Sequence, residues 1–202
     1  MRCSHAVVRD VAQDGCGSSS GLPSSALLSV ATPRGRESNL AFSSAGSRAR
    51  LVAIGTPAFR VTAGAAEACV FGYACGLDMT RRDLQLAARE KRWPWALGKD
   101  VEQSAIIGEL VPASDIGHVR AGLIELRVNG ATKQRADLSQ MIHGVADIIA
   151  HLSTYYHLHP GDVIFTGTPE GVGPVHPGDQ IDGSIAGVGE IAVHIGPAAA
   201  VV

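Results

Sequence analysis

Two charged residues, Asp78 and Lys99, have the types and positions that suit chemistry. They lie in GLDMTRRDLQ (76–85) and GKDVE (98–102), and the whole chain has only three lysines. A carboxylate can hold a hard cation, and an ammonium can stabilise negative charge that develops during a reaction. A carboxylate between a strand and a helix also suits a cap or a surface role, and Lys99, at an expected strand start, also suits a solvated turn. The spacing alone leaves both interpretations open.

The loop within GDVIFTGTPEGVGP (161–174) is a second candidate. Val163 to Phe165 suit a buried strand, and the glycines and prolines that follow prevent its continuation. Bare backbone of this kind suits a ligand that must contact main-chain N–H groups, and it equally suits a tight turn. No Gly-Lys-[Ser/Thr] follows, so the sequence excludes a nucleotide-binding P-loop.

Other candidate residues have simpler explanations. His157 and His159 alternate and could hold a metal, but the sequence offers no third ligand near them. Trp93 and Trp95 flank a proline just before Lys99, and they suit either core packing or the wall of a substrate pocket.

Strands with a few helices must position these residues. Apolar runs and turn residues predict strands at LVAIG (51–55), at CVFGYACGLD (69–78), in a hairpin over 123–134 that turns at Asn129-Gly130, and in a strand pair over 180–195. Thr80 and Asp83 have the spacing of a capping box, which predicts a helix from about 81 to 92. Apolar residues at helical spacing, beginning with Ile142, predict a second helix over 140–155. The expected fold class is mostly β with a few helices (α+β).

Composition excludes several classes of protein. The 202 residues are 46% hydrophobic and 18% charged with a formal net charge of −2, which suits one globular core and gives no electrostatic footprint for nucleic acid or an anionic membrane surface. No apolar run approaches the ~20 residues that span a bilayer. Cys3, Cys16, Cys69 and Cys75 have no CxxC spacing, which favours packed thiols in a reducing, cytoplasmic compartment over a disulfide scaffold.

The composition changes near residue 50. Residues 1–50 hold 11 of the 16 serines and no lysine, whereas 51–202 hold nearly all the patterned segments. We expect 1–50 to be an atypical or disordered N-terminal segment and 51–202 to be the domain that carries the candidate catalytic residues. A disordered tail, a mitochondrial targeting segment and a stretch translated in the wrong reading frame are the three explanations for 1–50.

From about residue 51 to 196 the chain resembles the fumarylacetoacetate hydrolase family. The resemblance is carried by FGYACGLDMTRRDLQ, WALGKDVEQSA, LRVNGATKQ, SQMI and HPGDVIFTGTPEGVGPVHPGDQI, in the order and near the spacings of the family. It implies a rolled mixed β-sheet of the family's C-terminal domain type, a Mg²⁺ or Mn²⁺ centre that chelates a 2,4-dioxo acid such as fumarylpyruvate or another acylpyruvate, and a homodimer. Decarboxylation or isomerisation of a small oxo acid is the alternative reaction, and a non-catalytic binding or dimerisation role is the alternative of another class.

The resemblance also implies roles for particular residues. Asp78 resembles a metal-binding carboxylate, and Lys99 resembles the catalytic lysine that stabilises negative charge. Arg82 and Gln85 resemble substrate-binding residues. Gly167 and Thr168 resemble the backbone and hydroxyl that bind the carboxylate and oxo groups of the substrate.

The chain departs from the family before residue 51. The family supplies two further metal ligands as Glu-x-Glu, and here the sequence reads SRARLVAIG. Counting back from Gly55 puts Ser47 and Ala49 at those positions, whereas counting from Leu51 puts Arg48 and Arg50 there. The family's Asn-Tyr motif, with the His and Glu that activate water, is also missing, since His5 has neither neighbour. We expect weak metal binding by the chain as it stands.

Overall fold

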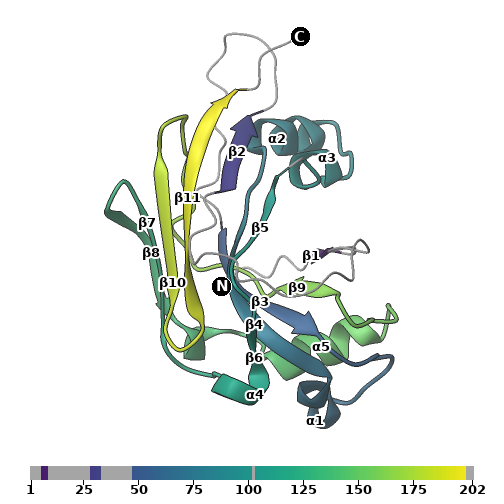
Figure 1. The fold of residues 1–202 in the computed structure, drawn as a ribbon. Helices are drawn as coiled ribbons and strands as arrows, with labels where there is room; N and C mark the ends of the chain where they lie inside the picture. Colours follow the sequence, from purple (N-terminus) through teal and green to yellow (C-terminus); the bar gives the residue numbers. More distant parts are fainter. Residues whose placement is uncertain (1–5, 9–27, 33–46, 102, 199–202) are drawn as a thin grey trace, which may run out of the picture.

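The computed structural model describes residues 6–8, 28–32, 47–101 and 103–198, which form two curved sheets and a few short helices (Figure 1). The first sheet has the order β1-β9-β3-β4-β5, with β6 also paired to β4, and all of its recorded pairs are antiparallel. Its strands are β1 (Ala6–Val8), β3 (Ser47–Ile54), β4 (Val70–Asp78), β5 (Ala105–Ile107), β6 (Val111–Pro112) and β9 (Val163–Phe165).

The second sheet has the order β2-β11-β10-β7-β8 and curves alongside the first (Figure 1). β2 runs parallel to β11, and the other neighbours are antiparallel, so this sheet is mixed. Its strands are β2 (Leu28–Thr32), β7 (Leu123–Val128), β8 (Ala131–Asp137), β10 (Gln180–Ile185) and β11 (Gly189–Ala198). The expected fold class, mostly strands with a few helices in curled sheets, is confirmed.

The helices are short and lie near the two ends of the sheets (Figure 1). They are α1 (Ala63–Ala66), η1 (Glu67–Cys69), α2 (Arg82–Glu90), α3 (Ala96–Lys99), α4 (Ala113–Ile116), η2 (Leu138–Gln140) and α5 (Val145–Ser153). In the described residues, no helix is long and apolar enough to cross a membrane.

Apolar side chains on the strands form two main clusters. One packs the first sheet against α1 and α5 and includes Tyr73, Ile149 and Leu158, each at most 1% exposed. The other joins the end of β4 to the second sheet through Leu77 and Leu126, which are fully buried. Burial of this kind stabilises the folded state by roughly 25 cal/mol per Å² of apolar surface. Because β4 contributes side chains to both clusters, it is the central strand of the fold.

The predicted hairpin over 123–134 is confirmed. Asn129 and Gly130 join β7 to β8 with φ of 51° and 78°, the left-handed values that the favoured two-residue hairpin turn requires. The strand pair over 180–195 is also confirmed as β10 and β11.

The predicted helix over 140–155 begins later than expected. α5 starts at Val145, and the Asp147 carboxylate accepts a hydrogen bond of 3.2 Å from the Gly144 N–H, which caps the helix there. Ile142 is 64% exposed and therefore does not belong to the buried stripe. Residues 138–140 form a separate 3₁₀ turn that Asp137 caps. The apolar spacing therefore predicted the helix correctly, but the cap at Gly144 determines where the helix begins.

The remaining predictions about packing have mixed outcomes. Cys69 and Cys75 are buried, as expected of packed thiols, and Cys3 and Cys16 lie outside the described residues. The core interpretation of the tryptophans was wrong, because Trp93 and Trp95 are 55% and 54% exposed.

Candidate active site

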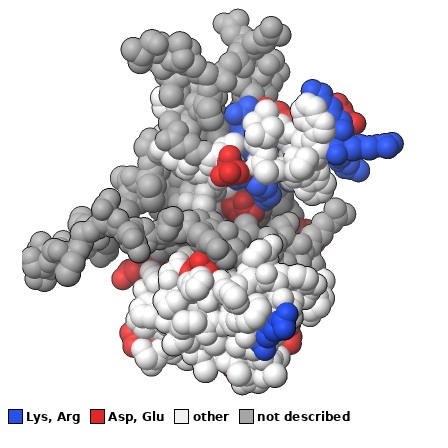
Figure 2. All heavy atoms as spheres, turned by 90° about the vertical axis from the view of Figure 1, so that its right-hand side faces the viewer, with Lys and Arg blue, Asp and Glu red and all other residues white. Residues whose placement is uncertain are grey.

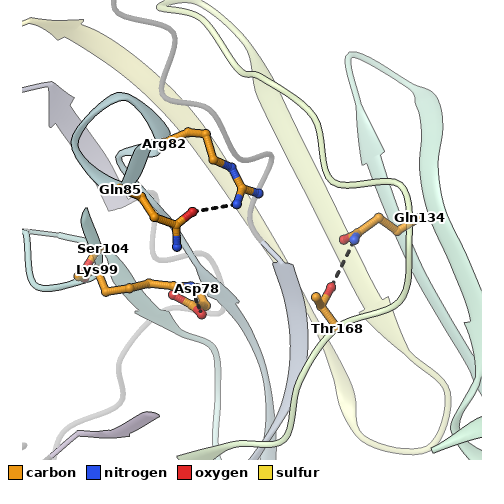
Figure 3. Close-up of polar contacts among 7 residues, drawn as sticks. All are labelled: Asp78, Arg82, Gln85, Lys99, Ser104, Gln134 and Thr168. Carbon is orange, nitrogen blue, oxygen red and sulfur yellow. Dashed lines mark hydrogen bonds and ion pairs between the residues drawn. The ribbon is translucent and has the colours of Figure 1, made fainter. Parts of the chain in front are cut away.

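Asp78 and Lys99 form an ion pair at the edge of the first sheet. Lys99 Nζ donates to Asp78 Oδ2 at 2.6 Å, and the two side chains are 31% and 15% exposed (Figure 3). Ser104 ties both ends together, because its hydroxyl donates to the Lys99 carbonyl at 2.9 Å and its carbonyl accepts from the Met79 N–H at 2.8 Å. Lys99 is the last residue of α3 and not a strand start, so that expectation was wrong.

Close packing of α3 on α2 brings Lys99 to this place. A Cβ at Gly98 would lie 2.8 Å from Gln85 Cβ, nearer than side-chain atoms approach one another, so only glycine fits there. The Gly98 carbonyl also accepts a 2.8 Å bond from the Arg81 N–H. The bare backbone at 98 therefore sets the distance between the two helices and the position of the lysine.

α2 presents the second polar pair of the site. Arg82 Nη1 donates to Gln85 Oε1 at 2.7 Å, and Gln85 is buried (Figure 3). A guanidinium held by a neutral amide keeps its full positive charge, which suits recognition of a carboxylate.

The capping box expected at Thr80 and Asp83 is not formed. The N-cap residue of α2 is Arg81, and Asp83 accepts two hydrogen bonds from the Arg81 guanidinium, at 2.8 and 2.6 Å. These bonds lower the pKa of Asp83 below its ordinary value and raise the pKa of Arg81. The Asp83 carboxylate therefore stabilises the first turn of the helix mainly through the side chain of Arg81.

The loop after β9 carries Gly167 and Thr168. Gly167 has a φ of +98°, which residues with a side chain rarely adopt. Thr168 Oγ1 accepts a 3.0 Å bond from Gln134 Nε2, across from the pairs on α2, α3 and β4 (Figure 3). The structure thus joins Asp78 to Lys99 and Arg82 to Gln85, while Thr168 bonds to the second sheet.

Charges of both signs lie on this side of the molecule. Figure 2 shows basic side chains on the outer part of one lobe and acidic and basic side chains together in the hollow below it. A mixed lining of this kind suits a small polar ligand better than a polyanion.

The strand register decides which positions face Asp78. Ser47 is the partner of Asp78 across β3 and β4, and Ala49 is the partner of Gly76. Paired residues of antiparallel strands share one face of a sheet, so positions 47 and 49 lie on the face of Asp78 and positions 48 and 50 lie on the other. Of the two counts, the one back from Gly55 gives the positions that share the face of Asp78, and the placement of the family's glutamates there stays a prediction.

The described residues do not fit a Mg²⁺ or Mn²⁺ centre. Such ions take several oxygen ligands, and the two positions that share the face of Asp78 hold serine and alanine. Asp78 itself is bound to an ammonium. Within the described ranges no group of three or more His, Cys, Asp or Glu could hold a metal ion, His157 and His159 included. The assignment of Asp78 as a metal ligand stays a prediction, and His5 lies outside the described residues.

Arg50 occupies the opposite face of β3 and is 4% exposed. It bonds to the Val119 carbonyl and, at 3.1 Å, to Met141 Sδ, and its guanidinium carbon lies 5.5 Å from the centre of the Tyr73 ring. Burial lowers its pKa, and its Nε has no hydrogen-bond partner in the described part of the chain. It lines a cavity of about 240 Å³ that Tyr73 and His118 also line. A buried guanidinium without a carboxylate partner is costly, and it is separate from the Asp78 site.

Sequence reasoning missed Gln134 and Ser104 as residues of this site. Gln134 lies in the stretch LRVNGATKQ. The only feature that could have identified it is its place on the strand. It is a buried polar residue on a strand whose neighbouring side chains are exposed.

Known proteins resemble this chain in sequence and in structure. The sequence profile described as fumarylacetoacetate (FAA) hydrolase C-terminal matches residues 51–196. Fumarylpyruvate hydrolase of Ralstonia sp is 53% identical over 148 residues, which cover 73% of this chain and 77% of that protein. A mitochondrial oxaloacetate tautomerase of Oryza sativa subsp. japonica is 42% identical over 119 residues, 59% of this chain and about half (53%) of that relative.

A solved structure agrees with this relationship. Fumarylpyruvate hydrolase from Pseudomonas aeruginosa, crystallised in complex with Mn²⁺ and pyruvate, superposes with a TM-score of 0.77 at 41% identity, covering 84% of this chain and 71% of that chain. The match of residues 51–196 extends over most of the chain and includes strands of both sheets, although β1 and β2 lie before it. The chain belongs to the fumarylacetoacetate hydrolase family.

Proposed function

We propose that the chain is a hydrolase of carbon–carbon bonds that takes 2,4-dioxo acids, with fumarylpyruvate as the first substrate to test. The observation that carries the proposal is the Lys99–Asp78 ion pair beside the Arg82–Gln85 pair. The relative from Ralstonia sp, at 53% identity, supports the substrate class.

Each site residue has a role that its chemistry supports. Arg82 and Gln85 bind the carboxylate and a neighbouring oxygen of the substrate, and the Thr168 hydroxyl with the Gly167 backbone binds from the opposite side. Cleavage between two carbonyl groups leaves an enolate, and the Lys99 ammonium stabilises that negative charge. Asp78 holds the ammonium in position, since their ion pair is partly buried.

We include Mg²⁺ or Mn²⁺ in this proposal only because it is the cofactor expected for the family. The site residues that the structure describes supply one carboxylate, and that carboxylate is bound to Lys99. We therefore infer that the chain as it stands turns over slowly and that its binding residues act without the full support that Mg²⁺ or Mn²⁺ gives in a complete centre.

Keto–enol conversion of an oxaloacetate-type acid is the second candidate function. It needs proton transfer but no activated water, and Lys99 with Asp78 is a pair of groups that can exchange a proton. The oxaloacetate tautomerase of Oryza sativa subsp. japonica, at 42% identity, favours this candidate. Decarboxylation and a role limited to binding remain possible outcomes of the same assays.

The test is an assay of the purified chain with fumarylpyruvate and acetylpyruvate, followed as loss of the ultraviolet absorbance of the enol, with products separated by chromatography. Release of pyruvate supports the hydrolase. Loss of absorbance without cleavage supports the tautomerase, and no reaction together with pyruvate binding supports the binding role. Light scattering tests the proposed homodimer, and the location of the protein in cytoplasm or mitochondria needs fractionation.

A further inference from the structure

Gln134 is a polar residue at a position where an apolar one would fit. It is 1% exposed and lies opposite Leu126 on the neighbouring strand, which is fully buried. The strand positions on either side of it, Lys133 and Arg135, are exposed. Burial of an amide costs free energy unless its hydrogen bonds are made, so its contacts must explain its presence.

Two hydrogen bonds of Gln134 go to the loop after β9. Its Nε2 donates to the Pro169 carbonyl at 3.0 Å and to Thr168 Oγ1 at 3.0 Å. A carbonyl oxygen only accepts, so the NH₂ end of the amide must face Pro169, and this settles the orientation of the side chain from chemistry alone. The loop at 168 and 169 is thereby attached to the second sheet.

The orientation of Gln134 fixes what the Thr168 hydroxyl can do. A hydroxyl has one proton, and here its oxygen already accepts from the amide. Its own proton points toward the Pro169 carbonyl at 3.2 Å, a longer bond than the 3.0 Å bond that the same carbonyl accepts from Gln134. The proton is therefore ready to turn toward an anionic oxygen, so Thr168 acts as a donor.

The loop also packs against β8 through backbone. Gly171 has a φ of +97°, and a Cβ there would lie 2.1 Å from the Lys133 carbonyl. This second close approach, next to Gln134 on the same strand, leaves the loop little freedom to move while the amide bonds hold.

We propose that Gln134 is a positioning residue for oxo-acid binding: it fixes the Thr168 hydroxyl as a donor and holds the 166–173 loop at the site. The inference deepens the proposed function and rests on it for the identity of the ligand. Gln134 acts through Thr168 and does not itself touch the substrate.

The test compares Gln134→Met, which keeps the length and loses both donors, with Gln134→Glu, which keeps the shape and presents acceptors. Lys133→Met, an exposed neighbour on β8, is the matched control. Pyruvate is the probe, and its affinity is measured by ligand-observed NMR. Both Gln134 variants should bind it about 3- to 10-fold more weakly, the usual effect of one net hydrogen bond, while the control binds as the native chain does.

A double-mutant cycle with Thr168→Val separates positioning from packing. If Gln134 acts through the hydroxyl, Gln134→Met should add nothing to the loss caused by Thr168→Val. Additive losses would overturn the inference.

Hydrogen exchange decides the question even if pyruvate does not bind. In Gln134→Met the peptide covering 166–173 should exchange faster, while peptides from β7 and β10 keep their native rates. Absence of pyruvate binding to the native chain would count against the proposed function alone. Unchanged exchange in 166–173, or equal acceleration throughout the second sheet, would show that Gln134 only fills space.

Discussion

Lys99 Nζ lies 2.6 Å from Asp78 Oδ2 although the two residues belong to different elements, α3 and β4. The ammonium contacts the carboxylate that was predicted, from the family resemblance alone, to be a metal ligand. Position 47, which shares that face of the sheet, supplies serine and no second carboxylate. The charges of Lys99 and Asp78 therefore neutralise each other in one ion pair. A metal ion or a substrate anion must compete with this ion pair to bind either residue.

The first prediction concerns metal binding. Mn²⁺ at low millimolar concentration should change the melting temperature of the native chain little. Ser47→Glu combined with Ala49→Glu should produce a rise of about 5–10 °C when Mn²⁺ is about 100-fold above Kd. Differential scanning fluorimetry with and without Mn²⁺ measures both.

The strand register supplies the control for that experiment. Arg48→Glu with Arg50→Glu adds the same two carboxylates to the opposite face of β3, so it should give no Mn²⁺-dependent rise. Equal rises in both double variants would mean that the assigned register is wrong, and a large rise in the native chain would mean that the missing glutamates were misjudged.

The second prediction concerns Lys99. In a chain that carries glutamates at 47 and 49, Lys99→Met should lower kcat for fumarylpyruvate by roughly 10²- to 10³-fold, the usual loss on deleting one charge-stabilising donor. Lys133→Met, which removes an exposed lysine, should leave kcat unchanged. Steady-state kinetics measures both, and an active Lys99→Met enzyme with native kcat would restore the interpretation of Lys99 as a solvated turn residue.

The third prediction concerns Arg50. Its guanidinium is 4% exposed with an unpaired Nε and a pKa lowered by burial. Arg50→Leu should therefore raise the free energy of unfolding by about 1–3 kcal/mol, since it removes a desolvated charge whose Nε has no hydrogen-bond partner among the described residues. Urea unfolding gives the value. Arg89→Leu, on the exposed side of α2, should change stability by less than about 0.5 kcal/mol. A lower midpoint for Arg50→Leu would show that the cavity depends on the charge.

The fourth prediction concerns acid stability. The bonds from Arg81 lower the pKa of Asp83 below 3.8, so the ionised carboxylate favours the folded state. This contribution is present above pH 3.8 and is lost as pH falls through the lower folded-state pKa. Asp83→Asn should melt at a lower temperature than the native chain at neutral pH, and the difference should shrink toward zero in acid. Arg81→Gln should show the same pattern, and a difference that is independent of pH would exclude the ion pair as its cause.

Local sequence signals predicted the elements better than their ends. Asn129-Gly130 predicted its hairpin because the turn requires left-handed backbone at two successive residues, and few residues accept it. Thr80 and Asp83 had the right spacing for a cap, but Arg81 took the carboxylate instead. The spacing rule does not consider a long side chain that reaches forward two residues and binds the same carboxylate.

The sequence predicted which residues belong to the candidate site, but not which of their side chains contact one another. Asp78 and Lys99 came from the family resemblance, whereas their direct contact depends on the packing of Gly98 against Gln85. The choice between positions 47 and 49 and positions 48 and 50 could not be made by counting, because a shift of one residue reverses the face of a strand. Gln134 escaped notice because its partner lies 34 residues away.

The residues of strand β4 have different structural roles along its length. Tyr73 and Cys75 belong to the cluster under α5, Leu77 belongs to the cluster under the second sheet, and Asp78 ends the strand at the site. Substitutions from 73 to 77 therefore change the packing of the fold, and Ala49 on the paired strand is itself buried, whereas Asp78 is the residue of β4 that the proposed site uses. A substitution at Asp78 can therefore alter the proposed site while both clusters stay packed, so loss of activity and loss of folding are separable outcomes for this strand.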